Sequence, residues 1–188
     1  TSIDEAEKSY RCFGDLYKKA RGMPAADDVK RCFRGLQNEK ARTFAAVADY
    51  APTVQQAIRM GYQDRELRSV LALDTELPRG LGMAKLSFVL ALLGDDTICL
   101  DARLLGRIFK RPGERTAFEK VIAKSDEGSV SAKGLLQYEA VEDAFLDGNP
   151  HYDPKDPVGR ARAQWLSWES VGGKGASHSV WLEMMEER

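Results

Sequence analysis

The sequence predicts an all-α protein, and three observations support that fold class. Apolar residues recur at positions three and four apart through most of the 188 residues, which is the spacing of amphipathic helices. No segment alternates apolar and polar residues for long enough to indicate a β-strand. The composition, with 43% hydrophobic and 30% charged residues, is typical of a soluble globular protein. We therefore expect one compact multi-helix domain spanning residues 1–188.

The N-terminal part of the chain predicts a series of short amphipathic helices. A first helix over residues 3–20 ends before Pro24, and Asp27 or Asp28 is expected to cap the second. Gly35 is expected to bend or end that second helix. Three further helices are predicted over residues 39–50, 53–60 and 64–73.

The C-terminal part continues the helical pattern. The proline-rich segment over residues 148–157 interrupts it and is predicted to be a loop. Tryptophans at helical spacing belong more often to a core than to a ligand site, so Trp165, Trp168 and Trp181 are expected to be buried. The helices of this part are predicted over residues 83–93, 101–109, 114–124, 130–145, 158–170 and 176–186.

The cysteines and histidines give no sign of a metal centre. Cys12, Cys32 and Cys99 lie among apolar residues, and we expect three reduced, buried thiols. Three cysteines cannot supply four thiolates to an iron–sulfur cluster, and His151 and His178 do not lie at zinc-ligand spacing. We expect neither a metal nor another cofactor.

The same sequence gives no sign of a membrane protein. No apolar run approaches the ~20 residues of a membrane-spanning helix. Charged residues interrupt the first 22 positions, so no secretory signal is expected either. We therefore expect a cytoplasmic location, either near the nucleoid or, for a viral protein, in the host cytoplasm.

The charge distribution permits a local basic surface. The net charge of −1 argues against a protein that coats nucleic acid by charge alone. Basic residues nevertheless concentrate between positions 103 and 115, where only Glu114 opposes them. They are Arg103, Arg107, Lys110, Arg111 and Arg115.

A glycine-rich turn, LPRGLGMAK over residues 77–85, stands directly before an apolar helix. Gly80 and Gly82 allow a tight turn and let another molecule approach the backbone closely. Met83 then opens a helix whose first amides lack partners, which is a natural binding site for phosphate. Arg79 and Lys85 would flank that site with positive charge. The alternative is a simple connection between two helices, which is the commoner meaning of a bare G-x-G.

Asp101 follows three apolar residues and opens the next predicted helix. Aspartate is a favoured N-cap, so one interpretation is that its side chain satisfies the amides of Arg103 or Leu104. The other interpretation is a catalytic carboxylate held beside the phosphate site. The two roles are compatible.

Residues 77–108 resemble the helix-hairpin-helix base-excision DNA glycosylase superfamily, the endonuclease-III-like group. The signature of that family is L-P-G-x-G-x-K-T-A, an apolar helix, and an apolar run ending in V-D-T-H-x-x-R. This chain has LPRGLGMAK, an apolar helix to Leu93, and then ICLDARLLGR with Asp101 in the place of the family aspartate. Residues 114–188 would form a divergent helical part.

The resemblance implies a fold of the glycosylase type and a DNA partner. The hairpin, with Gly80, Leu81, Gly82 and Met83, would hold a backbone phosphate, and the nucleotide would flip into a pocket. Asp101 would be the catalytic residue. Further DNA contacts are expected from Arg79, Lys85, Arg103 and Arg107.

The position of the Schiff-base lysine departs from the family pattern. Ala84 occupies that position, and Lys85, the next residue, is turned by roughly 100° on a helix. Lys85 is the second candidate catalytic residue, but a water nucleophile and a monofunctional reaction are favoured.

Three functional hypotheses stay open at this point. The first is an enzyme that excises a base, or one that remodels hypermodified pyrimidines, as some phage relatives of the fold are thought to do. The second is a DNA-binding or particle-associated module that has lost catalysis. The third is a helical interaction protein whose hairpin is only a connection.

Overall fold

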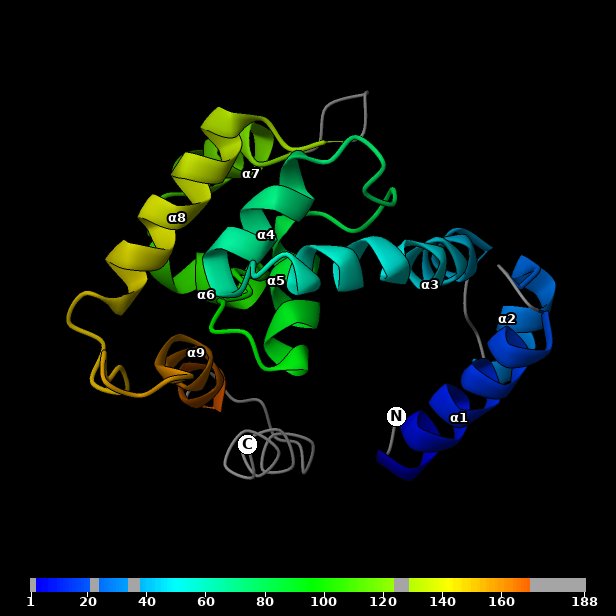
Figure 1. Ribbon diagram of the computed structural model, residues 1–188. Coiled ribbons are helices and arrows are strands. Elements are labelled where there is room, and N and C mark those ends of the chain that lie inside the picture. The colour runs from blue at the N-terminus through cyan, green and yellow to red at the C-terminus, as the bar shows by residue number, and fades with distance from the viewer. Residues whose placement is uncertain (1–2, 21–23, 34–37, 124–128, 170–188) are drawn as a thin grey trace.

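The computed structural model describes residues 3–20, 24–33, 38–123 and 129–169 (Figure 1). All regular structure in these residues is α-helical, which confirms the predicted fold class. None of the described helices is long and apolar enough to cross a membrane. The helices are α1 (Ile3–Ala20), α2 (Ala26–Cys32), α3 (Asn38–Arg59), α4 (Asp64–Leu73), α5 (Met83–Leu93), α6 (Ala102–Ile108), α7 (Pro112–Val121), α8 (Ala132–Leu146) and α9 (Gly159–Glu169).

Most predicted helices form close to their expected bounds. The helices over 3–20, 64–73 and 83–93 and the loop over 148–157 are confirmed. The expected cap of α2 is wrong, because Ala25 is its N-cap and both aspartates lie in its first turn. Helix α7 begins earlier than expected, because the proline at its first turn, Pro112, needs no hydrogen-bond partner for its nitrogen. Gly35, Trp181 and the helix predicted over 176–186 lie outside the described residues.

Helix α3 is a single helix where the sequence predicted two. Pro52 lies inside it and has no amide to donate to the carbonyl of Ala48, four residues earlier. The Tyr17 hydroxyl of α1 donates to that carbonyl at 3.2 Å. A side chain from another helix therefore satisfies the oxygen that proline leaves without its usual partner, and α3 continues to Arg59.

The apolar core of the described residues has a main part, a smaller N-terminal part and a small cluster of Ala91, Ala161 and Trp165. The main cluster joins residues of α3 through α9, with Leu67, Leu90 and Leu104 fully buried. Figure 1 shows α1 and α2 at one end of α3, away from the other helices. There Val29 and Ala45 form a separate small cluster. The single-domain organisation stays a prediction.

The expectation of three reduced thiols is wrong for two of the cysteines. Helices α1 and α2 pack together and bring Cys12 and Cys32 to a Cα–Cα distance of 5.5 Å, where they form a disulfide. Cys99 is free and buried, as expected. The pairing could not be read from the sequence because the two cysteines are 20 residues apart and meet only when α1 and α2 fold back on one another.

A buried ion pair joins α4 to α8. Arg68 and Glu142 are both fully buried, and their side chains meet through two nitrogen–oxygen contacts, one of them Nη2 to Oε2 at 2.8 Å. The guanidinium also lies 5.0 Å from the centre of the Tyr138 ring. Charges buried so deeply need partners, and here each is the main partner of the other. Arg65 adds a contact to Glu142 at 3.0 Å, and Glu139 adds one to Arg68 at 3.5 Å.

Asp96 caps the start of α9. Its Oδ1 accepts hydrogen bonds from the amides of Arg160 at 2.8 Å and Ala161 at 3.2 Å. Burial raises the pKa of this carboxyl to about 6, because the loss of hydration outweighs the two amides and the Arg160 guanidinium, which lower it. The ionised form of Asp96 is therefore less favourable in the folded chain than in the unfolded one.

This shift predicts a pH dependence of stability. A carboxyl whose pKa is higher in the folded state contributes stability below its unfolded pKa and loses it as pH rises through about 6. We expect the unfolding free energy of the parent, relative to that of Asp96→Asn, to fall by on the order of 2 kcal/mol between pH ~4 and pH ~7.5. Denaturant titrations at the two pH values measure it. A difference that stays constant would contradict the assignment.

Candidate functional site

Buried side chains, rather than a helix or a β-sheet, hold the segment 98–100 that leads to Asp101. The Glu142 carboxylate accepts from the Ile98 amide at 3.3 Å, and the Gln164 side-chain oxygen accepts from the Cys99 amide at 2.6 Å. The Tyr138 hydroxyl accepts from the Leu100 amide at 2.8 Å and donates to the Ile98 carbonyl at 2.9 Å. All three side chains are fully buried or nearly so. The backbone before Asp101 is therefore fixed by α8 and α9.

Asp101 is the N-cap of α6, as one of the two interpretations predicted. Its Oδ1 accepts from the amides of Arg103 and Leu104, both at 3.0 Å. The same oxygen accepts from the Trp168 indole nitrogen at 3.1 Å. No hydrogen bond to Oδ2 occurs within the described residues. One carboxylate oxygen therefore orients the side chain, and the other is open to a ligand.

The glycine-rich hairpin is a tight turn that opens α5. Gly80 has a φ of +87°, and a Cβ there would lie 2.9 Å from the Thr43 hydroxyl, so both the backbone and the space require glycine. The Leu81 amide donates to the Pro78 carbonyl at 3.1 Å. This corrects part of the prediction, because the Leu81 amide is already used inside the hairpin and is not open to a phosphate.

The first turn of α5 is open. Gly82 is the N-cap and provides no side chain to satisfy the helix amides. A Cβ at Gly82 would meet no atom within 4 Å, so a ligand can approach the backbone at this point. Lys85 lies one turn further on, and its ammonium donates to the Gly80 carbonyl at 2.8 Å.

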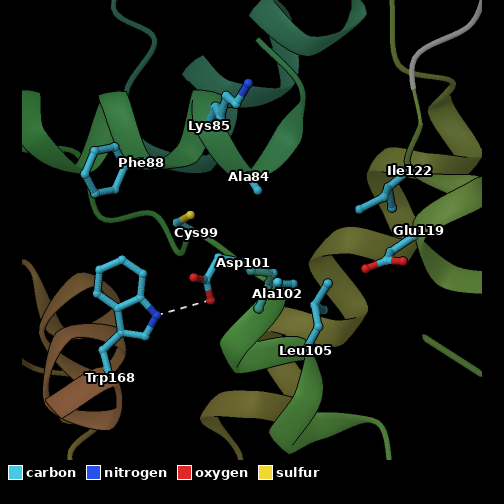
Figure 2. A pocket seen from close by; sticks show the side chains of 11 residues that line it. Ala84, Lys85, Phe88, Cys99, Asp101, Ala102, Leu105, Glu119, Ile122 and Trp168 are labelled. Carbon is cyan, nitrogen blue, oxygen red and sulfur yellow. Dashed lines mark hydrogen bonds between the residues drawn. The ribbon is translucent and has the colours of Figure 1, made fainter. Parts of the chain in front are cut away.

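A cavity of about 510 Å³ connects the first turn of α5 with Asp101 (Figure 2). Its volume falls in the usual range for small-molecule sites. Figure 2 shows the Ala84 methyl pointing into it, and the Lys85 ammonium turned away from Asp101. The lining residues are Ala84, Lys85, Phe88, Cys99, Leu100, Asp101, Ala102, Leu105, Glu119, Ile122 and Trp168.

The Cys99 thiol in the cavity wall is not activated. Burial, and then the nearby Asp101 carboxylate, raise its pKa to about 12. The thiol therefore stays protonated near neutral pH and is a poor nucleophile. Asp101 and Glu119 are the acidic groups of the lining, and Lys85 is its basic group.

Comparisons with protein-family models, curated proteins and solved structures found no match. Across the described ranges, no group of three or more His, Cys, Asp or Glu side chains could hold a metal ion.

The structure brings some predicted site residues together and separates others. Asp101 and Lys85 line the same cavity. The exposed Arg103 guanidinium lies 5.6 Å from the centre of the Trp168 ring, at the edge of this region. Arg107 instead donates to the Ser167 carbonyl at 3.0 Å and lines a separate cavity of about 470 Å³ next to the loop 147–151.

The hairpin residues differ in what they offer to a ligand. Arg79 and Gly80 are exposed. The side chains of Leu81 and Met83 are buried in the core, so Met83 offers its backbone alone. The role of these residues in DNA binding stays a prediction.

The site contains two residues whose place the sequence did not indicate. Trp168 was expected in the core, but it is only partly buried and forms a cavity wall that holds Asp101. Trp165 is buried as expected. Glu119 was not singled out, because its position on α7 gives no sign that α7 faces Asp101 across a cavity.

Proposed function

We propose that this protein is a DNA-binding enzyme of the helix-hairpin-helix glycosylase type, which flips a nucleotide and cleaves its glycosidic bond with water. The observation that carries the proposal is the open Oδ2 of Asp101 in the wall of a cavity that also reaches the first turn of α5. Base flipping needs two parts: a helix terminus that can hold a phosphate, and a carboxylate beside a cavity of nucleoside size.

The hairpin would hold the DNA backbone. The first-turn amides of α5, from Met83 and Ala84, carry the positive end of the helix dipole, which favours a phosphate. Gly82 leaves the approach open. Arg79 and Lys85 add positive charge beside it. Such contacts carry no base preference, so recognition of the base falls to the cavity.

Asp101 would act on the sugar of the flipped nucleotide. As the bond between the base nitrogen and C1′ breaks, the sugar gains positive charge, and a carboxylate stabilises that charge. The oxygen of water then bonds to C1′, the water loses a proton, and the base leaves with a proton. The products are a free base and an abasic sugar.

The neighbourhood of Ala84 supports a monofunctional reaction. The Ala84 methyl points into the cavity at the position where, by the proposed resemblance, bifunctional glycosylases carry an amine. The Lys85 ammonium is engaged with the Gly80 carbonyl. No amine is therefore presented to C1′, and water is the nucleophile that the site favours.

Release of free base tests the function directly. We would incubate the protein with duplex and single-stranded DNA that carry a panel of damaged and modified bases, and then separate free base from DNA. Release from at least one substrate is expected. DNA binding without any release would instead favour the binding module, and failure to bind any DNA would overturn the proposal.

Replacing Gly82 with aspartate should separate DNA binding from stability. Aspartate is a favoured N-cap and its Cβ meets no atom within 4 Å, so the unfolding free energy should be unchanged or slightly higher. Its charge would occupy the amides and repel a phosphate. We expect affinity for DNA to fall roughly tenfold or more, measured by fluorescence anisotropy.

Gly82→Asn is the matched control, because it also caps α5 but adds no charge. It should weaken binding less than aspartate does. Equal affinity of the parent and Gly82→Asp for DNA would show that the hairpin does not contact DNA.

A further inference from the structure

Glu119 faces the cavity from the wall opposite Asp101. It lies on α7, whereas Asp101 precedes α6 and Trp168 lies on α9 (Figure 2). Figure 2 shows its carboxylate directed into the cavity. Between the two acids the lining is apolar, with Leu105 and Ile122 among its residues. A base entering this cavity would find few polar groups away from Asp101, and Glu119 is one of them.

Arg115 contacts Glu119 at the open rim of the cavity, where the Glu119 side chain is 43% exposed. The Arg115 Nε donates to the Glu119 Oε1 at 2.8 Å, and its Nη1 donates to the Ala102 carbonyl at 3.3 Å. Ala102 is the first residue of α6, directly after Asp101. The arginine therefore links Glu119 to the same helix end that Asp101 caps. Within the described part of the chain, no hydrogen bond reaches Glu119 Oε2.

We infer that Glu119 makes the cavity selective for a base that carries an exocyclic amino group. This inference rests on the proposed function and adds the class of base to it. An ionised carboxylate only accepts hydrogen bonds, so its partner must be a donor. The amino groups of adenine, cytosine and guanine are such donors. A carbonyl oxygen at that place would face a carboxylate oxygen and would be repelled.

The two acids would contact different parts of the nucleotide. Asp101 caps α6 through one oxygen and leaves the other without a hydrogen bond in the described residues, so this second oxygen would face the sugar. Glu119 lies across the cavity, where the base would project. Glu119 is therefore a specificity-determining residue, and its removal should change which base is preferred without removing the carboxylate that acts on the sugar.

Pairs of DNA substrates whose bases differ by a single amino group test this inference. We would measure the affinity of the parent for duplexes with one unpaired central nucleotide carrying adenine or purine, guanine or hypoxanthine, and cytosine or pyrimidin-2-one. For at least one pair, we expect the amino-bearing member to bind about tenfold more tightly. This readout does not need glycosidic cleavage.

Two variants identify the residue responsible. Glu119→Gln can donate as well as accept, so the preference should fall to within about twofold. Glu114→Gln is the matched control: it removes an acid from the same helix, but Glu114 pairs with Arg111 at 3.5 Å and does not line the cavity. The control should keep the preference of the parent.

The outcomes separate this inference from the proposed function. Equal binding of all pair members, together with weakened binding by Gly82→Asp, would overturn the role of Glu119 and leave the DNA-binding function standing. A preference that survives in Glu119→Gln would do the same. Absence of DNA binding by the parent would overturn both.

Discussion

Asp101→Asn is expected to reduce base release roughly 100-fold or more, while affinity for DNA stays within a few-fold of the parent. Asparagine keeps a side-chain oxygen that can accept from the Arg103 and Leu104 amides and from the Trp168 indole. It loses the negative charge that would stabilise the cationic sugar. Single-turnover release of base from the best substrate of the panel measures the effect.

The geometry around Asp101 makes asparagine the informative replacement. Alanine would remove the cap of α6 at a cost of about 1 kcal/mol and also free Trp168 to move, so its effects would combine stability and chemistry. Unfolding curves of the parent and Asp101→Asn should nearly coincide. Undiminished release by a folded Asp101→Asn protein would show that the carboxylate is only a cap.

Glu142→Ala is expected to lower the unfolding free energy by roughly 3–5 kcal/mol. The change leaves the Arg68 guanidinium fully buried without the carboxylate that contacts both of its terminal nitrogens. It also removes the acceptor for the Ile98 amide. The segment that positions Asp101 should therefore loosen together with the contact between α4 and α8. Denaturant unfolding measures the loss.

Glu139→Ala is the control for that prediction. Glu139 lies about one turn before Glu142 on the same helix and contacts the same arginine, Arg68, at 3.5 Å. Because Glu139 is partly exposed, its loss should cost less than 1 kcal/mol. If Glu142→Ala fails to fold, Glu142→Gln keeps one acceptor and gives an intermediate loss. Equal small losses for Glu142→Ala and Glu139→Ala would contradict the role of the buried pair.

The helices were predictable where local residues decide them. The bounds of α1, α4 and α5 follow from apolar spacing and from the proline and glycine that flank them. Asp101 as an N-cap is also local, because the residue and the amides that it binds are two and three positions apart. The prediction failed at Pro52, where a hydroxyl from α1 compensates for the missing bond.

The walls of the site depend on contacts between distant residues, and these could not be predicted. Trp168 reaches Asp101 across 67 positions, and Gln164 reaches Cys99 across 65. Nothing in the sequence around Glu119 distinguishes it from a solvated glutamate on an amphipathic helix. The hairpin was found from its glycines, but the use of the Leu81 amide by Pro78 depends on the exact turn that they form.

We propose that the sugar of a flipped nucleotide lies against the Asp101 carboxylate. Two abasic analogues in otherwise identical duplexes test it without knowledge of the base: a pyrrolidine, which is protonated near neutral pH, and a neutral tetrahydrofuran. The parent should bind the cationic analogue roughly tenfold more tightly, and Asp101→Asn should bind both alike. Equal binding of the two by the parent, or a preference that persists in Asp101→Asn, would contradict the claim.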